Sequence, residues 1–401
     1  MLHETLVVAS LVLVTLALFA SIYITAFAAL GLIPRQGSVR TEPRVRFLVL
    51  VPAHNESRGI IPTIRSLQHA NYPADLLRLA VIADNCSDDT AAVARECGVE
   101  VWIRSDMRNQ GKGQALGWAL DKAALPFDLA AIIDADTEVD EDFFAAMNTN
   151  YLTQLQKGRA NVALQGKYLF SAGDSSVSWF QQFTAASKAA ENAFSYRPRT
   201  ALGLSNLIQG NGFCISHGAL EQVAFNTSSV VEDAEYAIEL ALNNVPVIYV
   251  ENAVVTSRIT QGLRAAAPQR IRWAGGVFAL MSHSVPSLLR SAIRERRWQL
   301  AEMAFMLVLT SRLLLIYTTL LAVALLDLAY PFHDFRYVAG GLAAAILLQG
   351  IYLYLLLRRA HSSPVPLQKI AFMPFYVGFL GVMQLGAVLG VRRHVWTRTI
   401  R

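Results

Sequence analysis

Four long apolar runs divide the chain, one near its start and three near its end. The first carries no charged residue over 5–34, and the later ones cover 303–328, 337–357 and 370–391. At about 1.5 Å per residue, each run is long enough to cross a hydrocarbon core of about 30 Å as a helix. The pattern predicts an N-terminal transmembrane anchor over 1–34 and membrane helices within 284–401. An arginine- and leucine-rich stretch at 285–299 predicts an interfacial helix that leads into the second group.

The flanking charges predict the orientation in the membrane. A cleaved signal peptide would begin with basic residues, whereas this chain begins Met-Leu-His-Glu, so a permanent anchor is preferred. Arg35 and Arg40 follow the anchor, which places the next domain in the cytoplasm of a multi-pass protein of the plasma (inner) membrane. Four arginines within 392–401 fit this rule only if the last apolar segment is re-entrant. Spanning and re-entrant arrangements both stay open.

Residues 35–283 alternate short apolar runs with segments of helical character. The runs predict strands, and the segments between them predict helices; the strands are expected at 47–51, 79–83, 99–103 and 130–133, and the helices at 58–70, 88–97, 113–123 and 141–156. This alternation is typical of a mostly parallel sheet covered on both faces by helices, an α/β domain. Ligands of such sheets bind beyond the carboxyl ends of the strands.

Composition supports a soluble domain joined to membrane helices. Hydrophobic residues make up 54% of the chain and charged residues 16%, yet 65 charged side chains remain, too many for a chain that lies wholly in the membrane. The net charge of +5 comes from arginines beside the apolar runs, so no nucleic-acid partner is expected. The three cysteines fit a reducing compartment rather than a disulfide framework or a zinc site.

Polar residues follow the predicted strands at the edge where a ligand would bind. Asp134 and Asp136 come after the fourth strand, and their spacing lets two carboxylates share a hard cation such as Mg²⁺ or Mn²⁺, which also takes phosphate oxygens. Lys112 lies on a glycine-flanked turn before a helix, where it can meet the same diphosphate. Glu56 and Asp84 can accept hydrogen bonds from a base and a ribose. Helix capping and surface charge are the alternative for each acidic residue alone.

Two later segments carry further candidates. Glu232 and Asp233 open a predicted helix, where they either complement its dipole or supply a general base. The sequence Gln-Arg-Ile-Arg-Trp at 269–273 lies in a helix-like stretch whose alternative interpretation is an amphipathic helix on the membrane.

Together these motifs resemble the membrane-integrated branch of the family 2 glycosyltransferases, which includes cellulose, chitin-oligosaccharide, hyaluronan and poly-β-1,6-N-acetylglucosamine synthases. The matching segments are VPAHNE, VIADNCSDDT, GKG, DAD, VED and QRIRW, in the family's order. The resemblance implies an A-type glycosyltransferase fold and an inverting transfer from a nucleotide sugar, usually a UDP-sugar.

The resemblance also implies a role for each candidate. Glu56 and Asp84 would contact the nucleoside, Lys112 the diphosphate, and Asp233 would deprotonate the acceptor. Asp134 would assist nucleotide binding and Asp136 would hold the divalent metal. Residues expected to face the diphosphate or the acceptor are Gly210, Asn211, Glu232, Gln269, Arg270, Arg272 and Trp273.

We therefore expect a synthase that extends a β-linked polysaccharide, with other polysaccharide-synthesis or export proteins as candidate partners. A single addition to a lipid-linked acceptor is the first alternative, and a glycan conduit with secondary transferase activity is the second. Val231 stands where the cellulose enzymes have Thr, and Asn-Gly-Phe-Cys-Ile at 211–215 replaces their Phe-Phe-Cys-Gly-Ser. Cellulose as the product is therefore in doubt. The sugar, the linkage and the oligomeric state are not specified by the sequence.

Overall fold

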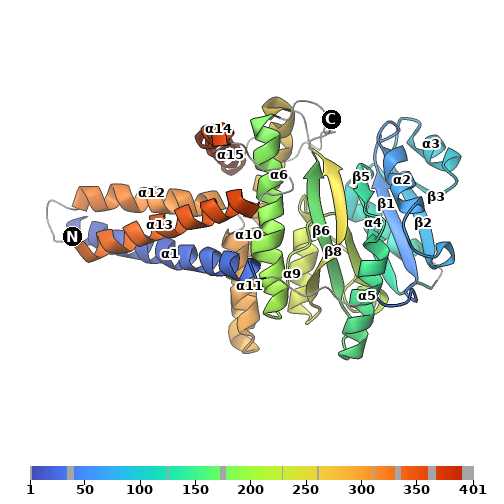
Figure 1. Ribbon diagram of the computed structural model, residues 1–401, viewed down its shortest axis with the longest axis horizontal. Helices are drawn as coiled ribbons and strands as arrows, with labels where there is room; N and C mark the ends of the chain where they lie inside the picture. Colours follow the sequence, from blue (N-terminus) through green and yellow to red (C-terminus); the bar gives the residue numbers. More distant parts are fainter. Residues whose placement is uncertain are drawn as a thin grey trace.

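Three long helices project from an α/β domain in the computed structural model (Figure 1). They are α1 (Leu2–Gly31), α12 (Arg312–Ala329) and α13 (Arg336–Arg359). The structure describes residues 2–33, 40–123, 126–171, 178–227, 229–259, 262–309, 312–329, 336–359 and 367–390. The C-terminal arginines of the predicted tail and Arg35 lie outside these ranges.

The domain is built on one eight-stranded sheet with the order β3-β2-β1-β4-β7-β6-β8-β5. The strands are β1 (Phe47–Ala53), β2 (Leu77–Asp84), β3 (Glu100–Arg104), β4 (Leu129–Ile132), β5 (Thr137–Val139), β6 (Ala163–Ser171), β7 (Phe213–Ser216) and β8 (Val247–Arg258). The first four in this order are parallel, as predicted. β7 runs antiparallel to both of its neighbours, and β5 is antiparallel to β8, so the second half of the sheet is mixed.

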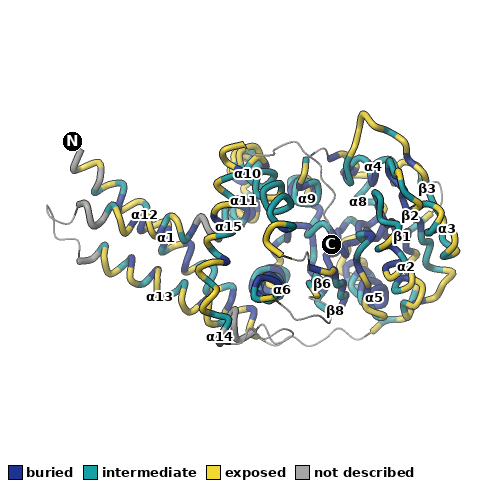
Figure 2. The backbone as a smooth tube through the Cα atoms, turned by 90° about the horizontal axis from the view of Figure 1, so that it is seen from above, coloured by how far each residue is buried: buried dark blue, intermediate teal, exposed yellow. Residues whose placement is uncertain are grey.

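Helices cover both faces because alternate side chains of each strand point to opposite sides. Phe47, Val49 and Val51 of β1 pack in the core of one face, and Leu48 and Leu50 in that of the other. The first face is covered by α2 (Ile60–Gln68), α3 (Thr90–Glu96) and α5 (Phe143–Gln156). The second is covered by α4 (Lys112–Lys122), α8 (His217–Gln222), α9 (Glu232–Leu242), α10 (Leu263–Arg294) and α11 (Trp298–Leu309). Figure 2 shows the strands largely buried between these layers.

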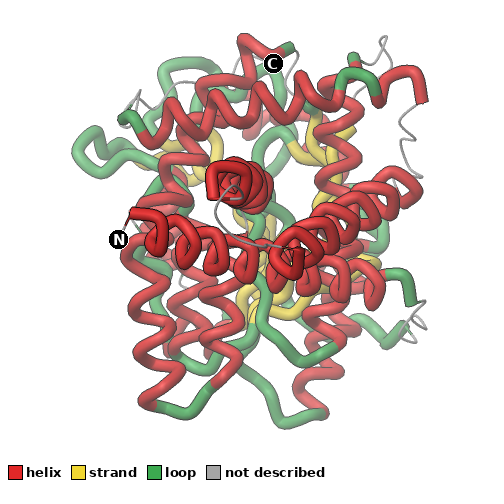
Figure 3. Tube along the Cα trace, turned by 90° about the vertical axis from the view of Figure 1, so that its left-hand side faces the viewer, coloured by secondary structure: helices red, strands yellow, loops and turns green. Residues whose placement is uncertain are grey.

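A layer of crosswise helices separates the sheet from the projecting bundle. In Figure 1, α10 and α6 (Trp179–Glu191) stand upright between the two, and α15 (Met373–Val388) is seen nearly end-on. Figure 3 looks from the bundle toward the sheet and shows helices lying in front of the strands. The remaining described elements are a 3-10 turn at Ala74–Leu76, a π-helical turn at Asn192–Tyr196, α7 (Arg197–Ala201) and the short α14 (Leu367–Ile370).

The structure corrects three helix boundaries. The predicted interfacial helix at 285–299 covers the end of α10, a turn and the first residues of α11. Because α10 is a continuous 32-residue helix, a domain boundary at 283 would fall inside it. The predicted span at 303–328 is two helices: Leu300, Met303, Ala304 and Leu307 form a buried stripe of α11 that packs into the core of the domain. The last segment is the 16-residue α15, which lies across the bundle direction.

The bundle itself has an apolar exterior. Among the described helices, Val7–Gly31 and Val338–Leu355 are the two stretches long and apolar enough to cross a bilayer. Their outward side chains include Leu16, which is 52% exposed, and Leu347, which is 65% exposed. Ala17 and Ala345 are fully buried, and both belong to the small apolar cluster formed where the helices meet. Small residues at these positions let the helices pack closely.

Arginines of α7 dock α1 on the domain. Arg197 donates to the carbonyl oxygen of Gly31 at the end of α1 (2.9 Å) and pairs with Glu251 of β8. Arg199 is 1% exposed and donates two hydrogen bonds to the carboxylate of Glu302 on α11, at 2.5 and 2.8 Å. It also donates to the Tyr23 hydroxyl of α1 (3.2 Å). These bonds hold the α/β domain against α1 and α11.

Candidate active site

A cavity of about 750 Å³ lies between the sheet and the bundle. Its wall includes residues from four of the predicted motif segments: Lys112, Asp134, the pair Glu232 and Asp233, and the stretch from Gln269 to Trp273. Segments that are far apart in the sequence therefore meet around one space. Further parts of the wall come from β6, α6, the loop before β7, and the helices α1, α11, α13 and α15.

The Gly-Lys-Gly turn places a cation at the centre of this wall. Gly111 has a φ of +121°, and a Cβ on Gly113 would lie 2.9 Å from the carbonyl oxygen of Thr227. Lys112 opens α4, and its Nζ donates to Asp134 Oδ1 at 2.5 Å and to the carbonyl oxygen of Gly210. Burial alone would lower the pKa of Lys112, but the nearby carboxylates, Asp134 first, raise it above its ordinary value. The ammonium therefore stays charged.

Asn211 holds the Asp-Ala-Asp loop from beneath. Its Oδ1 accepts from the backbone N–H of Asp134 (3.0 Å), and its Nδ2 donates to the hydroxyls of Thr137 (2.6 Å) and Ser257 (3.2 Å). Asn211 is 1% exposed. The predicted contact with the acceptor stays a prediction, and the amide of Asn211 is used here in fixing the loop that carries Asp134 and Asp136.

Glu232 and Asp233 occupy the first turn of α9, beside Gly210. Gly210 has a φ of +77°, and a Cβ there would lie 2.9 Å from Asp233 Oδ2, so the backbone approaches the carboxylate closely. Burial raises the pKa of Glu232 to about 7, and the charge of Asp233 adds to this. Burial also raises the pKa of Asp233, while the Lys112 ammonium opposes the shift. An elevated carboxylate pKa suits a group that must accept a proton near neutral pH.

The first turns of α10 supply the opposite charge. Gln269, Arg270, Arg272 and Trp273 all line the cavity. The Arg270 guanidinium lies 5.7 Å from the centre of the Trp273 ring, and Trp273 is 36% exposed. Burial lowers the pKa of Arg272, and the charge of Glu232 opposes that shift. Two cations and an aromatic ring thus face the two acids of α9.

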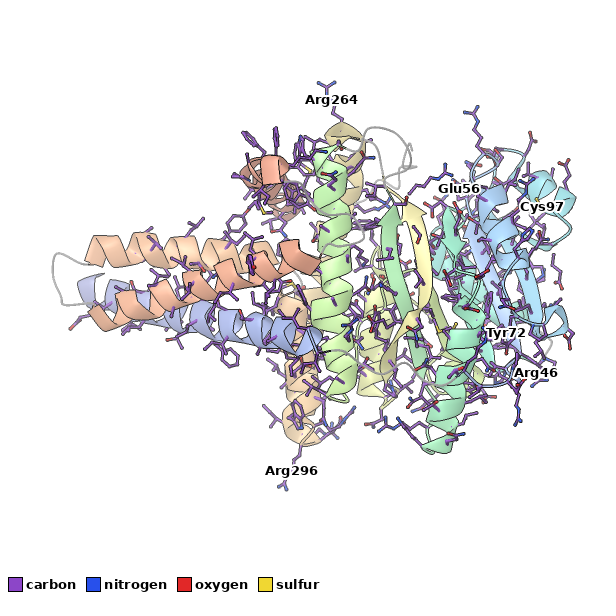
Figure 4. The ribbon with its side chains drawn as sticks, in the orientation of Figure 1. Arg46, Glu56, Tyr72, Cys97, Arg264 and Arg296 are labelled. Carbon is purple, nitrogen blue, oxygen red and sulfur yellow. The ribbon has the colours of Figure 1, made fainter. Side chains whose placement is uncertain are left out.

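Glu56 and Asp84 lie apart from this wall. Figure 4 shows Glu56 at the carboxyl end of β1, at the opposite end from Arg46. Asp84 is 7% exposed, and its Oδ1 accepts from Arg104 Nη1 at 2.7 Å. Arg104 also donates to the carbonyl oxygen of Asn109 (2.7 Å), in the loop before Lys112. Asp84 therefore fixes the position of Arg104 and, through Arg104, the loop before Lys112.

Sequence reasoning missed two buried cations, Arg104 and Arg199, and one partly buried cation, Lys188. Lys188 lines the cavity from α6, pairs with Glu191 at 3.0 Å and lies 5.0 Å from the centre of the Tyr168 ring. None of the three belongs to a short motif. For Arg104 alone the sequence held a signal: it ends a strand, where it can pair with Asp84 at the end of the neighbouring strand.

Comparison with known proteins identifies the chain. The sequence model of the family described as "Glycosyltransferase like family 2" matches residues 43–276, more than half of the chain. The chain belongs to this family. The protein is therefore a glycosyltransferase, and its α/β domain is the one predicted above. The family match ends just after the Gln-Arg-Ile-Arg-Trp segment.

This glycosyltransferase is similar to several curated proteins over its catalytic part. It is 26% identical over 253 residues to a beta-monoglucosyldiacylglycerol synthase of Synechocystis, covering 60% of this chain and 49% of that protein. It is 25% identical over 230 residues to a poly-beta-1,6-N-acetyl-D-glucosamine synthase of Staphylococcus epidermidis, covering 57% and 53%. The chain thus matches about half the length of these relatives.

A solved structure resembles nearly the whole chain. The mannosyltransferase PcManGT from Pyrobaculum calidifontis, in complex with GDP-Man and Mn²⁺, superposes with a TM-score of 0.58 at 19% identity. The superposition covers 95% of this chain and 99% of that one. This likeness shows that the fold, including the helices outside the α/β domain, has a counterpart of known structure.

Proposed function

We propose that the enzyme transfers a sugar from a UDP-sugar to an acceptor hydroxyl, with inversion, at the cytoplasmic face of the plasma membrane. The observation that carries this proposal is the single cavity in which Asp233 shares a wall with Lys112, Asp134, Arg270 and Arg272. A base and a set of cations around one space are what a displacement with an anionic leaving group requires.

Each group has a defined task in this mechanism. Glu56 and Asp84 bind the nucleoside of the donor, and Lys112, Arg270 and Arg272 stabilise charge that develops on the diphosphate. Asp233 takes the proton from the acceptor hydroxyl, whose oxygen attacks the anomeric carbon from the side opposite the diphosphate. Trp273 and Gly210 border the space for the acceptor.

The Asp134 and Asp136 carboxylates suit a divalent metal. Among the described residues there is no group of three or more His, Cys, Asp or Glu side chains that could hold a metal. These residues therefore do not form a complete set of metal ligands on their own. Two carboxylates on one loop next to a diphosphate form the donor set that Mg²⁺ or Mn²⁺ accepts. When bound there, the metal supplies electrostatic stabilisation of the leaving diphosphate.

Three membrane crossings fit the arrangement of helices. α1, α12 and α13 are 30, 18 and 24 residues long, and at about 1.5 Å per residue the shortest reaches about 27 Å. The crosswise α15 favours the arrangement in which the last segment does not span. After three crossings the chain is again on the cytoplasmic side, where the positive-inside rule prefers the terminal arginines.

The remaining alternatives for the function differ in the class of acceptor. Similarity to the poly-beta-1,6-N-acetyl-D-glucosamine synthase supports the growing polysaccharide, and similarity to the beta-monoglucosyldiacylglycerol synthase supports a lipid acceptor. The conduit is disfavoured, because Ala17, Ala322 and Ala345 are fully buried where α1, α12 and α13 pack together.

Asp233→Asn tests the assignment of the base. We expect transfer to fall at least about 10²-fold, the low end for a general base, because the amide cannot take the acceptor's proton. UDP affinity, measured by calorimetry with Mg²⁺, stays unchanged. Glu239→Gln, on the exposed side of the same helix, is the control and retains full activity. A parallel loss of UDP affinity and rate would make Asp233 a donor ligand instead.

A panel of UDP-sugars, with GDP-sugars for comparison and mass spectrometry of the products, tests the donor assignment. Release of UDP from at least one sugar nucleotide is the expected result. Turnover of GDP-sugars alone would overturn the UDP assignment.

A further inference from the structure

The part of the cavity wall that comes from α1, α11 and α15 is mainly apolar, with Tyr23 and Gln384 as its polar side chains. We call it the apolar half and define it by six side chains, which come from three helices: Ile24, Phe27, Met306, Leu309, Leu380 and Met383. α1, α11 and α15 supply two residues each, and Tyr352 of α13 lies on the same wall. Helices that lie in or against the bilayer therefore shape this end of the space.

The apolar half is continuous with the catalytic end. Asp233, Lys112 and Trp273 line the same cavity as the six apolar side chains. Between the two ends the wall is polar but neutral overall, since Lys188 and Glu191 form an ion pair at 3.0 Å beside Thr184 and Gln209. One molecule that reaches from the base to the bundle would be polar at one end and hydrocarbon at the other.

We propose that the acceptor is a lipid alcohol, whose hydrocarbon chain occupies the apolar half while its hydroxyl meets Asp233. This inference rests on the proposed function and names the substrate class of the same site. A growing glycan fits the space less well, because hydroxyl groups placed against Leu309, Leu380 and Met383 would lose hydrogen bonds to water without regaining them.

The charges at the catalytic end select an alcohol over a lipid phosphate. Glu232 and Asp233 place two acids beside the attacking position, where a phosphate would be repelled. Two of the cavity's cations already pair with carboxylates, Lys112 with Asp134 and Lys188 with Glu191. A phosphate oxygen also needs no base, whereas an alcohol does.

The proposed step balances as a single displacement. The Asp233 carboxylate accepts the proton of the lipid hydroxyl, and that oxygen forms a bond to the anomeric carbon. The bond between the anomeric carbon and the diphosphate oxygen breaks, and its electron pair leaves with UDP. The products are a glycolipid, UDP and protonated Asp233.

The experiment uses the full chain in phosphatidylcholine nanodiscs with the UDP-sugar found above. Three acceptors are compared: dioleoylglycerol and octyl glucoside, which carry hydroxyls, and farnesyl phosphate, which carries a phosphate. We expect a single sugar added to at least one of the two alcohols, recovered in the organic phase and identified by mass. Transfer only to farnesyl phosphate, or only into water-soluble polymer, would overturn the inference.

The design separates the failure of this inference from that of the proposed function. UDP release without transfer to any of the three lipids would overturn the lipid acceptor and leave the glycosyltransferase assignment intact. No UDP release under any condition would count against the proposed function itself.

Two neighbouring residues on α15 give a matched pair of variants. Met383 lines the cavity, whereas Val382 is 62% exposed and faces away from the cavity. Met383→Trp should lower transfer to the lipid alcohol by about tenfold or more, as filling a pocket does, and leave UDP-sugar hydrolysis within about twofold. Val382→Trp should change neither rate.

A second pair guards against misfolding of the α15 variants. On α1, Ile24 lines the cavity and Ile22 is 50% exposed, so Ile24→Trp and Ile22→Trp repeat the comparison. Wild-type transfer in both cavity-filling variants would overturn the placement of the lipid chain. An equal loss in lining and outward variants would do the same.

Discussion

The catalytic end of the cavity gathers charged side chains from segments that directly follow a strand or open a helix. The apolar half instead takes two side chains each from α1, α11 and α15, which are well separated in the sequence. At the catalytic end specific pairs form, as Lys112 does with Asp134, and the effect of a group depends on its geometry. In the apolar half, the effect of a side chain depends on its size and hydrophobicity, so Leu and Met can replace each other there at a small cost in stability.

This difference separates two kinds of substitution. Removing one charge at the catalytic end should change rates by orders of magnitude while leaving the fold intact. Changing the packing of α1, α11 and α15 should first change stability or acceptor use. The variants below test whether the two ends are independent in this way.

The largest effect is expected for Asp136→Asn. Loss of a metal-binding carboxylate should reduce turnover by at least about 10³-fold, since metal binding is worth several kcal/mol of charge stabilisation. Rates measured across a Mg²⁺ titration should show no recovery, and thermal stability should be unchanged. Glu138→Gln, two residues along and 53% exposed, is the control and should behave as wild type. Ordinary activity at ordinary Mg²⁺ in Asp136→Asn would remove this residue from the metal site.

Arg199→Met should act on stability rather than on chemistry. It leaves the Glu302 carboxylate buried without the guanidinium that binds it, which costs about 3–5 kcal/mol for a buried pair. The thermal midpoint of the detergent-solubilised protein measures the loss. Arg199→Met combined with Glu302→Leu should recover much of it, because no buried charge is then left alone. Unchanged stability in the single variant would show that this contact does not hold α11 to the domain.

The pH dependence probes the two acids of α9. Both pKa values are raised, that of Glu232 to about 7, so these carboxylates gain protons as the pH falls through the neutral range. We expect kcat/KM to fall about tenfold per pH unit on the acid side, beginning near neutrality. In Glu232→Gln the acid limb should move to lower pH, since Asp233 alone then titrates. A wild-type profile that is flat down to pH 5 would contradict the raised pKa values of Glu232 and Asp233.

The smallest effect is expected for Trp273→Ala. The ring borders the acceptor space, so its loss should reduce transfer about five- to tenfold, equivalent to about 1–1.4 kcal/mol of lost contact. UDP-sugar hydrolysis and thermal stability should stay near wild type. Trp298→Ala removes a 61% exposed ring at the start of α11 and serves as the control for membrane anchoring. If both variants lose stability and hydrolysis together, Trp273 anchors its helix and does not face the acceptor.

The parallel half of the sheet was predictable because its signals are local. Runs such as Phe47–Ala53 are short, apolar and followed by polar residues, and the observed strands lie within a few residues of the expected ones. The second half was not predictable, since the antiparallel placement of β7 between β4 and β6 depends on contacts distant in sequence.

The motif residues of the site were likewise easier to predict than the residues that hold them in place. Lys112, Asp134, Glu232, Asp233 and Arg270 were predictable from short patterns, and the cavity brings them together. Asn211 lies in an equally suggestive glycine-rich segment, yet it is buried beneath the Asp134 loop. Arg199 was missed because its partner Glu302 lies on another helix, and no spacing within one segment encodes such a pair. Lys188 pairs with Glu191 three residues further along the same helix, a spacing that is common on helix surfaces and does not by itself mark a site.

The Lys112 ammonium acts as an internal counter-ion of the cavity. It bridges the Asp134 carboxylate and the Gly210 carbonyl oxygen, and it also lies in the field of Glu232 and Asp233. The protein's own cation thus offsets repulsion among three carboxylates that come from two different segments of the chain. A neutral side chain at this position would leave these acids to repel one another, so the shape of the cavity depends on a charge that the fold itself supplies.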